Sequence, residues 1–230
     1  MTLHIGVVGC SAEGAALCYR TICTEGPQLL GEYAHPEVSM HTPSFGHYVA
    51  CLNTEDWKGV GEIMLASTRK LAKLGADFVI CPDNTVHQAF SYVKEKSPLP
   101  WLHIAEVVAD HARETGARRL GVMGTRWLLS SDIYPTALAS RGVEWMLPSE
   151  VEREEMSRII MEEFVHGNFE VKAVEYFQEV IRNMAAEGCD AVVLGCTEIP
   201  LIINDANSEL RTLDSARLLA RAALKRAIAG

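Results

Sequence analysis

The stretch Ala191-Val192-Val193-Leu194-Gly195-Cys196-Thr197-Glu198-Ile199-Pro200 decides the fold. Its short, unbroken apolar run is flanked by turn formers, a pattern typical of a buried strand in a parallel sheet. Gly195 lets the backbone turn sharply, so we expect Cys196 at the carboxyl end of the strand, where open α/β sheets bind ligands. We expect Thr197 to cap a following helix, and a thiol at a helix N-terminus has a lowered pKa and can act as a base or nucleophile.

A cysteine at a strand end can also be a small core residue, and a second stretch favours the functional interpretation. Phe78-Val79-Ile80-Cys81-Pro82 has the same buried-strand pattern and breaks at Asp83-Asn84-Thr85-Val86-His87. Aligning the two stretches places Asp83 opposite Cys196, with an offset of 196 − 83 = 113 residues.

Another pair of strand-turn segments repeats with nearly the same offset. Residues 4–11 match residues 119–126, and Gly6 aligns with Gly121 at an offset of 121 − 6 = 115 residues. Two pairs with nearly one offset indicate two homologous α/β halves related by a pseudo-twofold axis. Equivalent strand ends would then face each other across a cleft, with Asp83 and Cys196 on opposite sides of a small molecule.

Composition narrows the class of protein. The chain has 230 residues, 48% apolar content and a net charge of −9, and its Lys and Arg residues do not cluster. These features argue against nucleic acid and anionic membrane surfaces as partners. The seven scattered cysteines are typical of a reducing compartment. Because Glu13 interrupts the N-terminal apolar stretch and no segment is long enough to span a membrane, we expect a cytoplasmic protein.

The order of expected elements is that of a parallel α/β protein. Strands are expected near residues 3–9, 36–41, 77–82, 100–104, 119–124, 143–146 and 190–195. Helices are expected near 12–25, 54–74, 85–96, 105–115, 128–141, 150–166, 168–187 and 214–228. Several helices are predicted to end at a glycine, namely Gly26, Gly75, Gly116, Gly142 and Gly188.

Motifs along nearly the whole chain resemble those of a known family. They are Pro82-x-Asn84-Thr85-x-His87, residues 102–104, residues 121–126 and Gly195–Pro200, in this order. On these motifs the chain resembles the aspartate/glutamate racemase superfamily, in its aspartate racemase branch. The resemblance implies two pseudo-symmetric flavodoxin-like α/β domains with parallel sheets and an active site in the interdomain cleft. We place the domains at residues 1–104 plus 213–230 and at residues 105–212.

The resemblance also implies a chemistry. It implies cofactor-independent proton transfer at Cα of an amino acid, with a thiol on each face of the substrate, in a homodimer. This chain departs from that pattern, because Asp83 stands where racemising members carry the first cysteine. Cys81 lies one residue before Pro82 and should point elsewhere on a strand of period two, so we interpret it as a core residue.

Asp83 and Cys196 are therefore the predicted catalytic pair. A free aspartate has a pKa of about 3.9 and a free cysteine one of about 8.5, so at neutral pH an ionised carboxylate would face a protonated thiol. Polar residues at the strand ends are expected to contact the substrate: Ser11, Asn84, Thr85, Thr125, Thr197 and Glu198.

The resemblance suggests roles for these polar residues. Asn84, Thr85 and Thr197, with nearby backbone N–H groups, would cradle the α-carboxylate. Ser11 and Thr125 would line the cleft or act as plain helix caps. Glu198 would bind the substrate amine or orient a neighbour, and His87 and His103 would support the site or serve the fold alone.

The sequence offers several candidates for the residue that would bind the substrate side chain. An acidic side chain would need a cation, and the candidates are Arg126, His47 and Lys172. The segment 41–48 is predicted to form a wall of the cleft, but it contains no arginine.

The leading hypothesis is a cofactor-independent racemase of aspartate, glutamate or a related amino acid. The alternatives are a one-thiol lyase or isomerase acting on a small dicarboxylate, and a ligand-binding relative that has lost its chemistry. No metal, pyridoxal phosphate or nucleotide is expected. The chain lacks clustered His/Cys spacing, and residues 6–14 only loosely resemble a dinucleotide-binding fingerprint.

Overall fold

The computed structural model describes residues 2–230, which divide into two compact units. Unit 1 contains the chain up to Val107 together with Ala216–Gly230, and unit 2 contains Val108–Ser215. The junctions expected from the sequence, after residues 104 and 212, each lie three residues earlier (107 − 104 and 215 − 212). Each unit holds its own parallel sheet, so the predicted α/β class with two parallel sheets is confirmed. No helix within residues 2–230 is long and apolar enough to cross a membrane.

The sheet of unit 1 has the strand order β2-β1-β3, and all neighbours are parallel. Its strands are β1 (Ile5–Val8), β2 (Val38–His41) and β3 (Phe78–Ile80). β1 lies at the centre of this sheet, and β1 and β3 are both buried along their whole length, as expected for a parallel sheet covered on both faces. The strand predicted at 100–104 is wrong: only an isolated bridge joins Trp101 to Val79. Pro100 has no N–H to donate, and α6 begins at Ile104, so no ladder can extend there.

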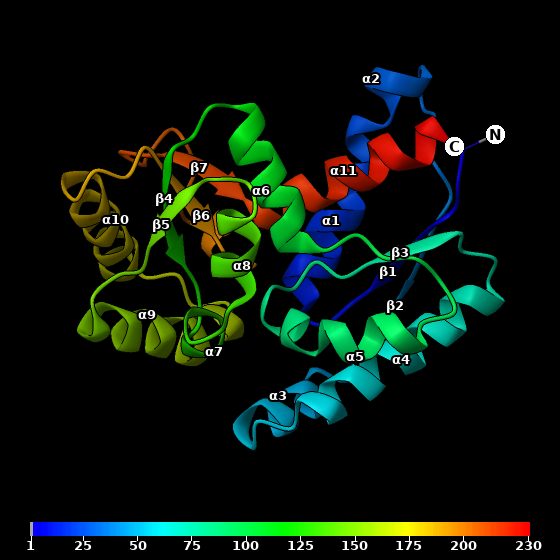
Figure 1. Ribbon diagram of the computed structural model, residues 1–230, viewed down its shortest axis with the longest axis horizontal. Coiled ribbons are helices and arrows are strands. Elements are labelled where there is room, and N and C mark those ends of the chain that lie inside the picture. Colours follow the sequence, from blue (N-terminus) through cyan, green and yellow to red (C-terminus); the bar gives the residue numbers. More distant parts are fainter. Residues whose placement is uncertain (1) are drawn as a thin grey trace. The chain divides into compact units, whose positions relative to one another are not determined.

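Helices cover both faces of this sheet. Figure 1 shows α4 (Trp57–Lys73) and α5 (Phe90–Lys96) along one face, and α1 (Ala12–Glu25) and α11 (Ser215–Ala229) along the other. The remaining helical segments of this part of the chain are α2 (Pro27–Leu30), α3 (Phe45–Asn53) and the 3-10 helix η1 (Thr85–Ala89). The core on the α1 and α11 side contains Ile5, Val7, Cys18, Ile22, Phe78, Ile80, Ile104, Leu219, Ala220, Ala223 and Ala227.

The sheet of unit 2 has the order β5-β4-β6-β7, again parallel throughout. Its strands are β4 (Arg119–Met123), β5 (Glu144–Met146), β6 (Ala191–Leu194) and β7 (Arg211–Asp214). α6 (Ile104–Glu114) begins in unit 1 and continues into unit 2. The other helical segments of unit 2 are α7 (Arg126–Leu129), α8 (Ile133–Ala139), α9 (Glu150–Glu162), η2 (Phe164–His166), α10 (Val171–Ala186) and η3 (Ile199–Leu201). α10 covers one face closely, because a Cβ at Gly121 would overlap the sulfur of Met184.

Glycine ends most of the helices for which the sequence predicted it. Gly75, Gly116, Gly142 and Gly188 have φ values of 88°, 74°, 70° and 90°, the left-handed region that glycine adopts without strain. Gly26 does not fit this prediction, since its φ is −52°. Its N–H donates to the carbonyl of Ile22, and the chain continues in a right-handed conformation directly into α2.

The strand register confirms the internal repeat. In unit 1 Gly6 pairs with Val79, and in unit 2 Gly121 pairs with Val192. The partner positions differ by 192 − 79 = 113 residues, the offset that relates Asp83 to Cys196. Asp83 and Cys196 therefore each lie four residues beyond the partner of an equivalent glycine (83 − 79 and 196 − 192).

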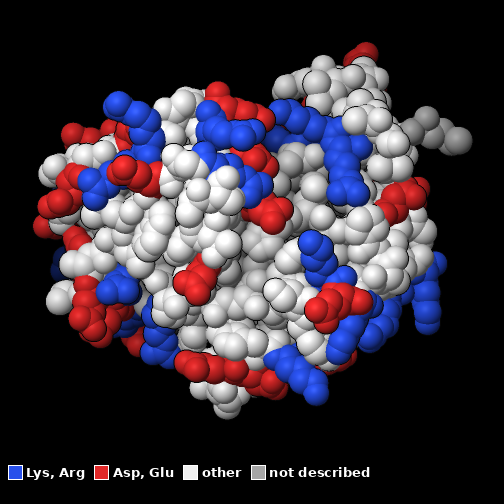
Figure 2. Space-filling view, in the orientation of Figure 1, with Lys and Arg blue, Asp and Glu red and all other residues white. Residues whose placement is uncertain are grey.

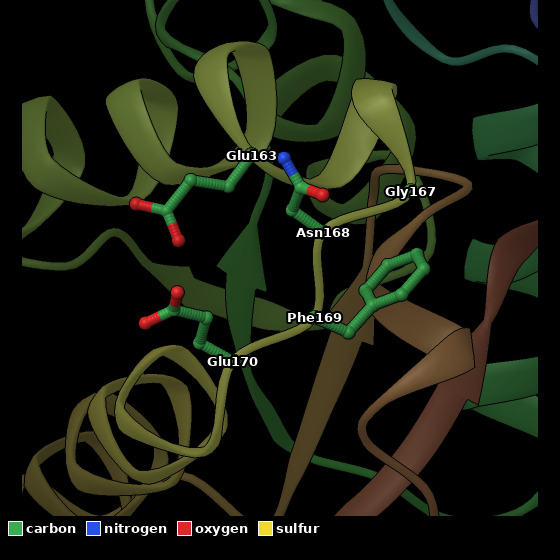
Figure 3. Close-up of a pocket in the computed structure, with 5 residues that line it drawn as sticks. All are labelled: Glu163, Gly167, Asn168, Phe169 and Glu170. Atoms are coloured by element: carbon green, nitrogen blue, oxygen red, sulfur yellow. The ribbon is translucent and has the colours of Figure 1, made fainter.

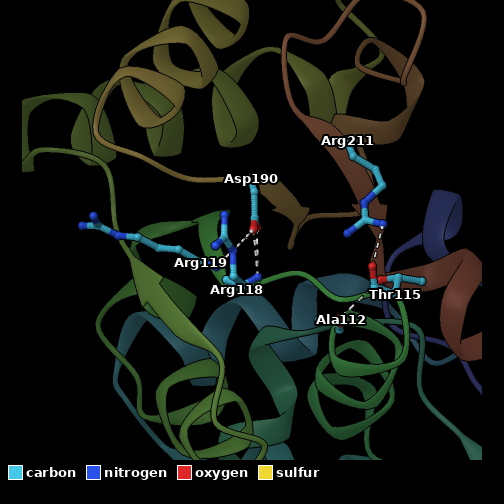
Figure 4. Close-up of polar contacts among 6 residues, drawn as sticks. All are labelled: Ala112, Thr115, Arg118, Arg119, Asp190 and Arg211. Atoms are coloured by element: carbon cyan, nitrogen blue, oxygen red, sulfur yellow. Dashed lines mark hydrogen bonds and ion pairs between the residues drawn. The ribbon is translucent and has the colours of Figure 1, made fainter.

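An aspartate at the amino end of β3 and of β6 repeats with the same offset. In unit 1 the N–H of His4 donates to Asp77 Oδ2 at 2.7 Å, while the N–H of Asp77 donates to the carbonyl of His4 at 2.9 Å. In unit 2 Asp190 makes the same exchange with Arg119, at 3.3 Å and 2.9 Å (Figure 4). Asp190 also accepts the N–H of Arg118 at 2.9 Å. We call this arrangement the aspartate clamp; it fixes the register of β1 with β3 and of β4 with β6.

Candidate functional site

The turn after β6 is built around Gly195. Its N–H donates to the carbonyl of Met123 at 2.9 Å, so the ends of β6 and β4 stay in contact as the chain turns. A Cβ at this position would overlap that carbonyl and lie 2.7 Å from Leu128 Cδ2. Within residues 191–200 Cys196 alone is not buried, so this turn presents one reactive side chain to solvent.

Gly195→Ala is expected to destabilise the protein by about 1–3 kcal/mol, because the added methyl group forces β6 away from β4. The same shift should displace Cys196 and slow any reaction that depends on it. Denaturant unfolding measures the stability. Gly46→Ala is the matched control: its Cβ would meet only Ser44 Oγ at 3.7 Å, and the exposed position in α3 should tolerate alanine. Equal stability of the two variants would contradict the packing argument.

The Cys196 thiol is held by a neighbouring carboxylate. Cys196 Sγ donates to Glu198 Oε2 at 2.9 Å, and Thr197 Oγ1 donates to the same oxygen at 2.8 Å. Thr197 and Glu198 are both buried. This network holds the thiol in one rotamer, and of the two roles that the sequence suggested for Glu198 these contacts favour the orienting one.

The predicted helix cap at Thr197 is wrong. Glu198 occupies the N-cap position of η3, no side chain caps that helix, and the Thr197 hydroxyl is drawn to the Glu198 carboxylate instead. η3 is a single 3-10 turn with Pro200 inside it, not an α-helix. The helix dipole grows with aligned peptide units, so this short turn gives the thiol little of the expected help.

The turn after β3 also leaves a single residue incompletely buried. Asp83 is half-buried, and it is the one residue of 78–87 that is not buried. Its Oδ1 accepts the N–H of Val86 at 3.4 Å, a long contact, and its backbone carbonyl accepts His87 Nδ1 at 2.7 Å. The backbone of Asp83 is thus anchored while its carboxylate reaches the surface of unit 1. Asn84 and Thr85 are buried beside it.

His87 and His103 make contacts that hold this turn in place. Burial, and then the neighbouring His103, lower the pKa of His87 well below its usual value, so its ring is neutral. With the proton on Nδ1, Nε2 accepts the N–H of Ile104 at 3.5 Å. The His103 ring packs edge-on against His87 and Phe90, with centroids 4.6 Å and 4.7 Å away. Of the two roles suggested by the sequence, these contacts favour the structural one.

The other predicted site residues lie at the carboxyl edges of their own sheets. In unit 1 Ser11 is the N-cap of α1 and accepts the N–H of Gly14 at 3.2 Å. In unit 2 Thr125 occupies the N-cap position of α7, but its side chain makes no cap bond. Unit 1 therefore brings together Ser11, Asp83, Asn84 and Thr85, and unit 2 brings together Thr125, Cys196, Thr197 and Glu198.

The candidate cations are on the surface of their units. The Arg126 guanidinium lies over the Trp127 ring at 4.6 Å, and His47 and Lys172 are exposed. On the face shown in Figure 2 acidic and basic side chains are interspersed.

Sequence reasoning missed Tyr48, which lies on α3. The side chain is 0% exposed, and its hydroxyl has no hydrogen-bond partner among residues 2–230. Burial, followed by the neighbouring Cys81, Cys10 and Asp83, raises the pKa of Tyr48 far above its usual value. Only a search of segment 41–48 for neutral donors as well as cations would have singled it out. Cys81 is buried, as expected of a core residue.

A pocket of about 520 Å³ lies elsewhere in unit 2, between the end of α9 and the start of α10. It is lined by Glu163, Gly167, Asn168, Phe169 and Glu170, and Figure 3 shows the two carboxylates pointing toward one another. Glu163 also pairs with Arg158 at 3.0 Å. The pocket contains none of the predicted site residues. Within residues 2–230 no three His, Cys, Asp or Glu side chains group as metal ligands.

Comparison with known proteins identifies the family to which the chain belongs. The model of the Asp/Glu/hydantoin racemase family matches residues 5–223. The broad specificity amino-acid racemase RacX of Bacillus subtilis is 23% identical over 152 residues, which are 66% of this chain and 65% of that protein. The next two curated relatives, both glutamate racemases, are matched over 57% and 54% of their own lengths.

Solved structures agree over nearly the whole chain. An aspartate racemase homologue from Pyrococcus horikoshii has 28% identity and a TM-score of 0.84, covering 99% of this chain and 100% of that one. The aspartate racemase of Picrophilus torridus has a TM-score of 0.80 and covers 98% of this chain and 94% of that one; at 19% identity it shows the fold alone. Because the family model spans both sheets and the turns after β3 and β6, the chain belongs to the Asp/Glu/hydantoin racemase family.

Proposed function

We propose that the protein is a cofactor-independent amino-acid racemase that moves the α-proton of aspartate, glutamate or a related amino acid. Asp83 and Cys196 are the proposed acid/base pair. The observation that carries the proposal is their equivalence: at the same register position of the two repeats, each turn exposes a single proton-transferring side chain. The names of the relatives, which are racemases of amino acids, support the same chemistry.

The proton steps balance within this pair. In the resting state the Asp83 carboxylate removes the α-proton from one face of Cα and becomes a carboxylic acid. The Cys196 thiol delivers its proton to the opposite face and becomes a thiolate. The other enantiomer reacts from this second state in the reverse direction. A carboxylate is a much weaker base than a thiolate, so the first step is harder than in a two-thiol enzyme.

Glu198 has a defined part in this cycle. Its carboxylate accepts the thiol proton in a hydrogen bond and so aims the sulfur. Once the thiol has lost its proton, two negative charges lie side by side, which raises the energy of the thiolate and makes it a stronger base. Asn84, Thr85 and Thr197 are proposed to cradle the α-carboxylate, with Ser11 and Thr125 at the neighbouring strand ends. The homodimer and the cytoplasmic location remain predictions.

Solvent deuterium exchange tests the proposal directly. Incubated in D₂O without added metal or pyridoxal phosphate, the protein is expected to exchange the α-proton of both enantiomers of at least one amino acid. NMR of a panel of L- and D-amino acids measures this, even where inversion is slow. Exchange with no amino acid, together with turnover of a substituted malonate, would instead support the one-thiol lyase.

A further inference from the structure

We propose that Tyr48 is a substrate-binding residue, whose buried hydroxyl donates a hydrogen bond to a substrate oxygen held beside Asp83 at the carboxyl edge of the unit 1 sheet. The location of the substrate rests on the proposed function. That the buried hydroxyl needs a hydrogen-bond acceptor does not rest on the proposed function.

The first argument is the unmet hydrogen bond. Buried polar groups in native proteins almost always have a hydrogen-bond partner, because an unpaired group loses its hydrogen bonds to water and gains none within the protein. Tyr48 is fully buried and its hydroxyl has no partner among residues 2–230. Tyr134, the other large tyrosine buried to this degree, is satisfied: it bonds to Ser215, whose hydroxyl donates to the carbonyl of Leu194 at 2.9 Å. A buried tyrosine with a structural role, such as Tyr134, therefore has a hydrogen-bond partner within the protein.

The second argument is where the hydroxyl lies. α3 starts four residues after β2 ends (45 − 41), so Tyr48 comes from the carboxyl end of β2. β2 is hydrogen-bonded to β1, which leads to Cys10, and β1 is hydrogen-bonded to β3, which leads to Asp83. The phenol interacts electrostatically with both of these residues and with Cys81. Three adjacent strands thus converge on the edge where α/β sheets bind ligands.

The third argument is chemical. Burial holds the phenol in its neutral form, so it remains a hydrogen-bond donor throughout the working pH range. A donor without charge next to the Asp83 carboxylate does not neutralise that base, whereas a lysine or arginine there would lower its basicity. The ligand that fits supplies an oxygen acceptor, either of its α-carboxylate or of its side chain.

Tyr48→Phe against Tyr134→Phe tests the inference. Without ligand, Tyr48→Phe should unfold at the wild-type temperature or a few degrees higher, because it removes an unpaired hydroxyl. Tyr134→Phe should unfold a few degrees lower, because it breaks a buried bond. In α-proton exchange, Tyr48→Phe should lose about 10- to 100-fold in kcat/KM, while Tyr134→Phe keeps the wild-type value. If Tyr48→Phe loses the same factor in kcat/KM with alanine as with substrates that have side-chain oxygens, the hydroxyl binds the α-carboxylate. If the loss is confined to substrates with side-chain oxygens, the hydroxyl binds the substrate side chain.

Three results would overturn the inference. A fall in the unfolding temperature of Tyr48→Phe matching that of Tyr134→Phe would show a structural partner, and an unchanged kcat/KM would remove the substrate contact while leaving the racemase intact. The ligand-induced rise in unfolding temperature, measured with the same amino acids and with malonate and maleate, separates the two proposals. If wild type exchanges no α-proton but is stabilised by one of these ligands, and Tyr48→Phe is not, the racemase fails and the role of Tyr48 stands. If wild type exchanges no α-proton and none of these ligands stabilises it, both fail.

Discussion

Cys196→Ser is expected to reduce α-proton exchange and racemisation by about 10²- to 10⁴-fold while the protein remains folded. A serine hydroxyl is a far weaker acid than a thiol, so it can neither return a proton to Cα nor persist as the conjugate base. The hydroxyl can still donate to Glu198, so the turn after β6 keeps its network. Deuterium exchange followed by NMR gives the rate, and thermal unfolding confirms the fold.

Cys189→Ser is the matched control for this variant. Cys189 precedes the amino end of β6, next to the aspartate clamp, whereas Cys196 follows the carboxyl end. Its replacement is expected to leave exchange unchanged, apart from a modest loss of stability at a buried position. Near-wild-type exchange by Cys196→Ser would remove the thiol from the mechanism.

The second large effect is expected at Asp83. Asp83→Asn should lower exchange by about 10²- to 10⁴-fold, because the amide cannot accept the α-proton. Asp83→Cys restores a thiol in the first turn and should raise racemisation of a bound amino acid above wild type, by about tenfold, since a thiolate is the stronger base. The pH profile distinguishes the two bases: a free carboxyl ionises near pH 4 and a free thiol near pH 8.5, so Asp83→Cys should lose activity as the pH falls through about 8.

Asp77→Asn provides the control for Asp83→Asn. It makes the same chemical change beside the other end of β3, where the side-chain oxygen can still accept the N–H of His4. Exchange at the wild-type rate is expected. If Asp83→Asn also keeps the wild-type rate, the carboxylate is not a base, and Cys196 acts alone as in the one-thiol alternative.

Features determined by local sequence were predictable. β1, β3 and β6 are short apolar runs followed within two residues by glycine or proline, and each is buried as expected. The equivalence of Asp83 and Cys196 followed from sequence offsets alone, and the strand register bears it out. β7 was missed because an exposed arginine begins it and Leu213 is its one buried residue, so it carries no apolar run.

Features determined by tertiary packing were not predictable. A threonine three residues after a strand suggests a cap, yet the Thr197 hydroxyl turns to Glu198, a choice that depends on burial of both side chains. Tyr48 lies in a segment with glycine, serine and proline nearby, which conceals α3. That its buried hydroxyl interacts electrostatically with Asp83 follows only from the adjacency of β2, β1 and β3.

The aspartate clamp bears on how such a protein evolves. The two halves share these carboxylates, Asp77 and Asp190, each six residues before a proposed catalytic position (83 − 77 and 196 − 190). The proposed catalytic positions differ, since one is an acid and the other is a thiol. Because the clamp lies at the amino end of β3 and of β6, and the proposed catalytic side chain follows the carboxyl end, one half can change its chemistry without changing the contacts that set its register. A duplicated gene with this layout can acquire a new reaction one half at a time.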